Sequence, residues 1–185
     1  MTADLTPGFA SPLQAQSCFR AVLAAFATPG TAVTLPVALT PPPGLSPAAA
    51  AVLLTLADAQ TSVALPDSAR NWLTFHTGAR LAAPAQADFV AAAARPPLAT
   101  LRQGSDISPE DGATLILDLP SFAGASYRLS GPGLREPVRV TLPLNGAFLP
   151  EWRAQTRSAP RGVDILICVD TAVLALPRSL HIEEA

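Results

Sequence analysis

The side chains that could carry out chemistry are few in this sequence and are spread along the chain. His76 stands in the segment Trp-Leu-Thr-Phe-His-Thr-Gly, where it could act as a general acid or base or contact an anion. The alternative is a histidine at the end of a helix, charged or hydrogen-bonded near the last carbonyl groups, where cations are favoured. One histidine without a paired group does not decide between the two.

A second candidate group follows an apolar run near the C-terminus that predicts a buried strand. Side chains at strand ends often line sites in α/β folds, so Arg178, Ser179 and His181 could together hold a phosphate or phosphonate oxygen. The alternative is a solvated terminal segment in which Arg178 pairs with Glu183 or Glu184.

Carboxylates stand before two further predicted strands. Glu110 and Asp111 precede one strand, and Asp164 begins another. Paired carboxylates can perform acid–base work, although such residues more often shape turns and accept hydrogen bonds from backbone N–H groups. The sequence contains no G-x-S-x-G, H-E-x-x-H or G-x-G-x-x-G pattern. The residues by themselves therefore predict no self-sufficient active site.

The composition excludes several classes of protein. The 185 residues include twelve arginines and no lysine, so neither a pyridoxal phosphate enzyme with its Schiff-base lysine nor a Walker A loop is possible. The net charge of -2 argues against a nucleic-acid-binding protein. Cys18, Cys168 and the two histidines are too few for a recognisable zinc site, and we expect both cysteines to be buried free thiols. No bound cofactor or metal is expected.

Charged residues make up only 14% of the chain, against 49% apolar residues. Either this is a compact domain of biased composition, or partner subunits cover part of its surface, because the cores of interfaces are depleted in charge. No apolar run approaches the length of a membrane span, and residues 1–11 lack the features of a signal peptide. We therefore expect a cytoplasmic protein that binds neither membranes nor nucleic acid.

Periodicity and capping signals predict one α/β domain over residues 1–185. Ser11 and Pro12 begin a helix that Thr28-Pro29-Gly30 ends, with an apolar stripe at Ala15, Phe19, Val22, Leu23 and Phe26. Further helices are predicted over 48–56, 68–76 and 148–157. Strands are predicted over 31–39, 62–65, 88–91, 113–119, 126–129, 138–142, 163–169 and 172–176.

Seven short segments, in order along nearly the whole chain, resemble the PhnH family, the H subunit of the bacterial carbon–phosphorus lyase system. The similarity of each segment is weak by itself, but the set in this order is specific to the family. The stretch 135–150 matches the family poorly. The segments are Gln16-Ser17-Cys18-Phe19-Arg20 with Thr28-Pro29-Gly30, Leu53 to Asp58, Phe75-His76-Thr77, Pro109 to Leu117, Leu129 to Gly133, Gly162 to Leu166 and Leu176 to Ser179.

The resemblance implies a three-layer α/β sandwich like that of pyridoxal-phosphate-dependent transferases, without the cofactor. It also implies a homodimer that joins the G, I and J subunits in a core complex for alkylphosphonate breakdown. In that system a phosphonate displaces adenine from ATP to give a ribose 1-phosphonate 5-triphosphate. The polar members of the matched segments include Arg20, at the edge of the first helix, where it could face a cleft or a partner.

Three hypotheses remain open from the sequence. The first is an accessory, non-catalytic subunit of the phosphonate-degrading complex. The second is a domain that binds a phosphonate or nucleotide through Arg20, His76 and Arg178, with Glu110, Asp164 and His181 as polar support. The third is a stand-alone module that binds a small molecule.

Overall fold

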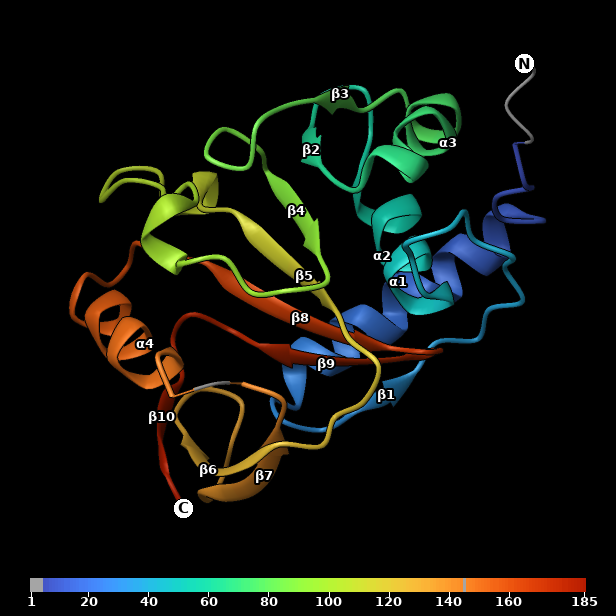
Figure 1. The fold of residues 1–185 in the computed structure, drawn as a ribbon. Helices are drawn as coiled ribbons and strands as arrows, with labels where there is room; N and C mark the ends of the chain where they lie inside the picture. The colour runs from blue at the N-terminus through green and yellow to red at the C-terminus, as the bar shows by residue number, and fades with distance from the viewer. Residues whose placement is uncertain (1–4, 145) are drawn as a thin grey trace.

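A sheet of seven strands runs through the middle of the computed structural model, which describes residues 5–144 and 146–185 (Figure 1). The strand order is β1-β9-β8-β5-β4-β2-β3. From β3 to β8 neighbouring strands are parallel, whereas β9 is antiparallel to β8 and β1 is antiparallel to β9. The strands are β1 (Val33–Thr34), β2 (Ser62–Ala64), β3 (Arg80–Leu81), β4 (Phe89–Ala92), β5 (Thr114–Asp118), β8 (Asp164–Val169) and β9 (Ala172–Leu176).

Three helices cover one face of this sheet: α1 (Pro12–Ala27), α2 (Pro47–Leu56) and α3 (Asp67–Thr77). The helix α2 contacts β5 and β8 directly, and α1 packs against both α2 and β9. Every residue of α2 from Ala48 to Leu53 is buried. Because four of these are alanines, the backbone of α2 can come close to the sheet and to α1 at once.

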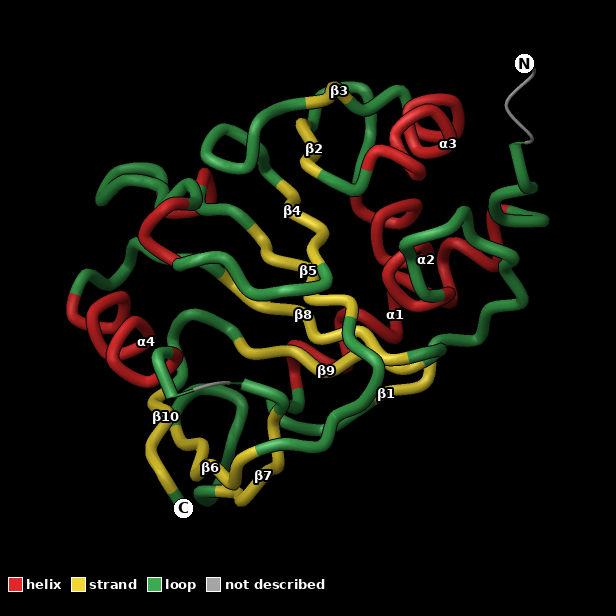
Figure 2. The backbone as a smooth tube through the Cα atoms, viewed as in Figure 1, coloured by secondary structure: helices red, strands yellow, loops and turns green. Residues whose placement is uncertain are grey.

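The opposite face is covered by α4 (Phe148–Arg157) and by a second, antiparallel sheet in the order β10-β6-β7. Its strands are β6 (Ala125–Ser130), β7 (Val138–Leu142) and β10 (His181–Glu184). Phe148, Trp152 and Tyr127 fill the space between this layer and the central strands. Figure 2 shows α1, α2 and α3 on one side of the sheet and α4 with the small sheet on the other. The prediction of a layered α/β fold is confirmed.

The hairpin between β8 and β9 turns at Asp170 and Thr171, as predicted, with Asp170 in a left-handed conformation at φ 50°. Both residues also accept hydrogen bonds from the chain that leads into α2. The N–H of Leu35 donates to the carbonyl of Thr171, and that of Ala48 donates to the carbonyl of Asp170, each at 2.8 Å. The turn therefore joins the end of the central sheet to the start of the helical layer.

Two predictions about the first fifty residues are wrong in part. The strand expected over 31–39 pairs only at Val33 and Thr34, because Pro36 has no N–H to continue the ladder. The apolar stripe predicted on α1 is displaced: its buried side consists of Cys18, Val22 and Ala25. Phe19 and Leu23 are instead 50% and 57% exposed, because α1 packs closely against α2 and only small side chains fit between the two helices.

An ion pair missed by the sequence analysis fastens α4 to the loop after β4. Arg95 donates to the two carboxylate oxygens of Glu151 at 2.6 and 3.1 Å, and the Leu98 N–H donates to the same carboxylate at 2.8 Å. The side chain of Arg95 is 8% exposed, and its guanidinium carbon lies 5.7 Å from the ring centre of Phe148. The hydrogen bonds from Arg95 hold the pKa of Glu151 below its ordinary value, although burial opposes this.

We expect Glu151→Gln to lower the free energy of unfolding by about 3 kcal/mol at neutral pH, because it removes one charge of a largely buried pair. A carboxylate whose pKa is lower in the folded than in the unfolded protein contributes fully to the free energy of unfolding when the pH is above its pKa in the unfolded chain. This contribution is lost as the pH falls through the pKa of the folded protein. The difference between the two proteins should therefore shrink below about pH 4.5. Urea denaturation between pH 3 and 7 measures it.

The control for this experiment is Glu136→Gln, on an exposed position outside the helices and strands, which should follow the unaltered protein at every pH. A constant difference between Glu151→Gln and the unaltered protein down to pH 3 would contradict the ion-pair explanation.

Candidate functional site

Polar side chains gather at the edge of the sheet where the parallel strands begin. Ser62 is the first residue of β2, Asp88 directly precedes β4, and Asp164 is the first residue of β8. Because β2, β4, β5 and β8 are paired in parallel, their first residues lie in one row. Ligands of open α/β sheets more commonly bind at the opposite, carboxyl edge.

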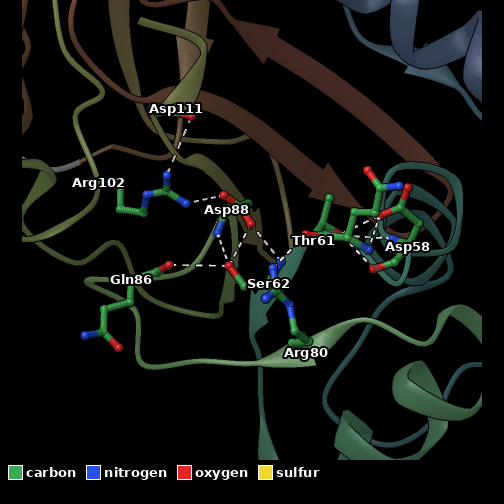
Figure 3. A network of polar contacts seen from close by, with 9 residues as sticks. Asp58, Thr61, Ser62, Arg80, Gln86, Asp88, Arg102 and Asp111 are labelled. Carbon is green, nitrogen blue, oxygen red and sulfur yellow. Dashed lines mark hydrogen bonds and ion pairs between the residues drawn. The ribbon is translucent and has the colours of Figure 1, made fainter. Parts of the chain in front are cut away.

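Asp88 is the centre of the first cluster in this row (Figure 3). Its carboxylate accepts hydrogen bonds from the Ser62 N–H at 2.7 Å and the Ser62 hydroxyl at 2.6 Å, and it is paired with Arg102. Burial would raise the pKa of Asp88, but the hydrogen bonds from Ser62 and the charge of Arg102 outweigh it and lower that pKa. Asp88 is therefore a charged anchor at neutral pH and a poor general base.

A hollow of about 500 Å³ opens beside this cluster. Arg102 reaches from Asp88 towards Asp111 at 3.8 Å (Figure 3). Arg80 donates to the carbonyl of Gln60 at 2.8 Å. Both guanidinium groups have acceptors within the protein, so the cluster chiefly joins the starts of β2 and β4 to the loop before β5. The hollow is lined by Gln60, Ser62, Arg80, Leu81, Ala82, Gln86, Asp88 and Arg102.

The second cluster contains two of the residues that the sequence singled out, Asp164 and Arg178. The Arg178 N–H donates to one oxygen of Asp164 at 2.7 Å, and its side chain donates to the other oxygen at 3.0 and 2.6 Å. A third side-chain N–H donates to the carbonyl of Pro109 at 2.6 Å. The partner of Arg178 is thus Asp164 and not Glu183 or Glu184, and the guanidinium joins β8, the end of β9 and the turn at Pro109–Asp111.

Glu110 lies in that same turn, next to Pro109, and its side chain is exposed. The turn approaches Arg178 so closely that a side chain on Gly112 would collide with the guanidinium and with the carbonyl of Gly162. The sequence analysis named Asp164 and Arg178 in separate groups; the structure brings the two together, and the arginine is engaged by the protein itself.

The other candidates lie elsewhere. Arg20 is exposed on α1, and His76 lies in the last turn of α3, where its ring nitrogen Nε2 is 3.1 Å from the carbonyl of Thr6. The Trp72 indole donates to that same carbonyl at 2.8 Å, so His76 helps to hold the N-terminal segment on α3 and does not bond the last carbonyls of its helix. His181 begins β10 beside α4. No hydrogen bond or ion pair joins Arg20, His76 and Arg178 in the part of the chain described.

A hollow of about 630 Å³ lies against β2 and β4, with Arg70 as its charged member. Its walls are otherwise apolar and built mostly from alanine, valine and leucine, and Arg70 is paired with Asp67 on the surface. Such a wall can hold an apolar group but offers no acid, base or nucleophile.

The cysteines are free and buried, as predicted, and burial raises the pKa of both thiols. They are therefore poor nucleophiles. Over residues 5–144 and 146–185 there is no cluster of three or more side chains that could hold a metal ion, and no helix is both long and apolar enough to cross a membrane.

The family comparison matches residues 7–183 to a family described as bacterial phosphonate metabolism protein (PhnH). The chain belongs to this family. The match includes both ion-pair clusters at the amino edge of the sheet and the Arg95–Glu151 pair. The PhnH resemblance seen in the ordered sequence segments is thereby confirmed over nearly the whole chain.

Two relatives have informative names. A protein of Rhizobium meliloti (strain 1021), named alpha-D-ribose 1-methylphosphonate 5-triphosphate synthase subunit PhnH, is 35% identical over an alignment covering 95% of this chain and 94% of its own. A protein of Stutzerimonas stutzeri, named putative C-P lyase subunit protein HtxG, is 33% identical over 90% of this chain and 85% of its own. Both names describe subunits of larger assemblies.

The cluster around Ser62, Asp88 and Arg102 was not identified from the sequence. The predicted strand 88–91 begins at Asp88, and a carboxylate at the start of a strand is the only signal of this residue, a signal that Asp164 shares. Ser62 and Arg102 have no recognisable motif. Ser62 meets Asp88 through the parallel pairing of β2 and β4, and Arg102 meets it from the segment before β5, where its carbonyl accepts from the Ala113 N–H.

Gly112 provides a test of the second cluster. Its φ of -65° and ψ of 140° suit any residue, so Gly112→Ala should act through the collision with Gly162 and Arg178 alone. We expect a loss of about 2 kcal/mol in the free energy of unfolding, as for other overpacking substitutions. The matched control is Gly146→Ala, since a Cβ at Gly146 meets no atom within 4 Å. Equal urea midpoints for the two variants would contradict the tight packing described.

Proposed function

We propose that this chain is an accessory subunit, with no catalytic centre of its own, of a ribose 1-methylphosphonate 5-triphosphate synthase that takes part in alkylphosphonate breakdown. The observation that carries the proposal is the similarity to the Rhizobium relative over nearly the full length of both chains, because that relative is named as a subunit of this synthase. The family assignment to phosphonate metabolism supports it.

The geometry supports an accessory role. The conspicuous charged groups of the interior and of the sheet edge are engaged with one another: Asp88 with Arg102, Asp164 with Arg178, and Arg95 with Glu151. The described residues include no nucleophile paired with a histidine, and Asp88 is held in its charged form. We propose that the reacting groups belong to other subunits.

The partners that we propose are the G, I and J subunits of the same system, together with a second copy of this chain. The kinship of the fold to pyridoxal-phosphate-dependent transferases, a single domain over residues 1–185 and a cytoplasmic location stay predictions. The absence of lysine agrees with a relative of those transferases that lost the cofactor.

Co-purification tests the assembly. A tagged form of this chain, co-expressed with the G, I and J subunits of its own operon, should elute with them in a stoichiometric complex on size exclusion. If the chain elutes without them while the other three form their complex, it is not an obligatory member, and the stand-alone binding module becomes the better hypothesis.

The outer side of α1 is where we propose that two copies meet. Leu13, Phe19 and Leu23 are 73%, 50% and 57% exposed, and Arg20 is the only charged residue of the helix. Interfaces between identical chains are more apolar than other protein surfaces, and a two-fold axis would place the same apolar side chains opposite one another. This face thus fits a second copy better than a charged partner.

We expect light scattering at micromolar concentration to give about twice the chain mass of 19.0 kDa, and Phe19→Glu with Leu23→Glu to give a monomer. Both positions are exposed in the single chain, so the fold should persist by circular dichroism. The control is Leu81→Glu, which is 49% exposed on the edge strand β3 away from α1 and should stay dimeric. An unaltered dimer in the double variant would exclude α1 as the contact.

A further inference from the structure

The arginines that have no carboxylate partner are concentrated on one side of the molecule. Arg70, Arg95, Arg102, Arg161 and Arg178 are in ion pairs. Seven described arginines are outside these pairs, and two of them, Arg20 and Arg80, lie on α1 and β3. The other five lie on the small sheet, on its connecting loop or on α4: Arg128, Arg135, Arg139, Arg153 and Arg157.

A hollow of about 240 Å³ opens on this side, between α4 and β10. Arg153 and Arg157 stand one turn apart on α4, and His181 is the first residue of β10, whose packing against α4 brings it to the same hollow. The remaining lining residues are Trp152, Thr156, Ile182 and Glu183.

The base of the hollow is rigid. Trp152 is fully buried, and its indole N–H donates to the carbonyl of Leu180 at 2.9 Å, which ties α4 to the residue before β10. Ile182 is 3% exposed and belongs to the same core. The Thr156 hydroxyl donates to the carbonyl of Trp152 at 2.9 Å, which leaves its oxygen as an acceptor only. The backbone positions that carry Arg153, Arg157 and His181 are therefore fixed by packing.

The charges of the hollow are unbalanced. Two guanidinium groups four residues apart on a helix repel one another, and no carboxylate in the described part of the chain pairs with either. Glu183 is the one acidic residue of the lining, and it stands directly opposite Arg128 in the pairing of β10 with β6. A bound anion between Arg153 and Arg157 would remove this repulsion.

We propose that the hollow between α4 and β10 is a binding site for a phosphate- or phosphonate-type oxyanion, held by Arg153, Arg157 and His181. Guanidinium groups match such tetrahedral oxyanions with two parallel N–H donors each, and the histidine ring adds another N–H. Glu183 disfavours an anion here and therefore weakens the site. The oxyanion could come from free phosphate, from an alkylphosphonate or from the phosphates of a nucleotide.

This site is separate from the one that the sequence predicted. His181 was expected to act with Arg178 and Ser179, but Arg178 is bound to Asp164, and the arginines beside His181 come from α4 instead. The proposal also stands apart from the proposed function, since it depends only on charges and geometry of this chain.

Isothermal titration calorimetry of the full chain at low ionic strength tests the site, with inorganic phosphate, methylphosphonate and ATP as the three probes. We expect the protein to bind at least one of them. The double substitution Arg153→Ala with Arg157→Ala should weaken that binding at least tenfold, because the loss of a single charge-assisted hydrogen bond already lowers affinity by about that factor. Glu183→Gln should strengthen the same binding severalfold. The relative affinities of the probes identify the source of the oxyanion.

The control is Arg135→Ala with Arg161→Ala, which makes the same change of net charge at exposed positions that do not line the hollow and should bind like the unaltered protein. The proposal fails if none of the three probes binds at millimolar concentration, or if the control variant weakens binding as much as the α4 variant. Loss of partner subunits from the α4 variant without binding of any probe would also overturn it, and would assign this basic side to an acidic protein surface. The titrations themselves do not bear on membership of the synthase, which co-purification decides separately.

Discussion

The burial of both faces of β5, β8 and β9 is the constraint on which the other layers depend. Along β8, alternate residues enter the two cores: Leu166 and Cys168 face the helices, while Ile165 and Ile167 face α4 and the small sheet. Since each core needs the same strands, neither outer layer has an apolar surface to pack on without the sheet. The edge clusters of Asp88 and Asp164 then fix where the strands begin, because a carboxylate that accepts several N–H bonds fits one register only.

The sequence predicted the central part of this arrangement and missed its periphery, for physical reasons. The hairpin of β8 and β9, the strand β5 and the helix α2 are continuous apolar runs, and burial on all sides is the only stable place for them. The short edge strands β3 and β10 have no such signal, since His181 to Glu184 reads as a polar terminus. On α1 the error concerned which apolar face is buried, and periodicity cannot rank faces that are both apolar.

The same reasoning separates the candidate residues that could be found from those that could not. Asp164 and Arg178 stand beside apolar strands, so their proximity follows from the hairpin. Ser62 and Arg102 are forty residues apart in sequence without a motif, and they meet at Asp88 because β4 lies between β2 and β5 in the sheet. In the sequence Arg153 and Arg157 look like ordinary residues on the surface of a helix. Only the contact between α4 and β10 shows that His181 lies near them. The candidate sites of this chain are therefore formed by contacts between segments that are far apart in the sequence.

The turn at Asp170 and Thr171 has a consequence for how the chain can be altered. Hairpin tips are ordinarily the places where a tag, a loop of another protein or a new chain end is tolerated. Here both carbonyls of the tip hold the segment that leads into the buried helix α2, through Leu35 and Ala48. Opening the backbone at this point would remove the two hydrogen bonds that hold Leu35 and the first turn of α2, as well as the turn between the two strands. The residues around Ile107, exposed at the end of a loop on the opposite edge of the sheet, are the better place for an insertion.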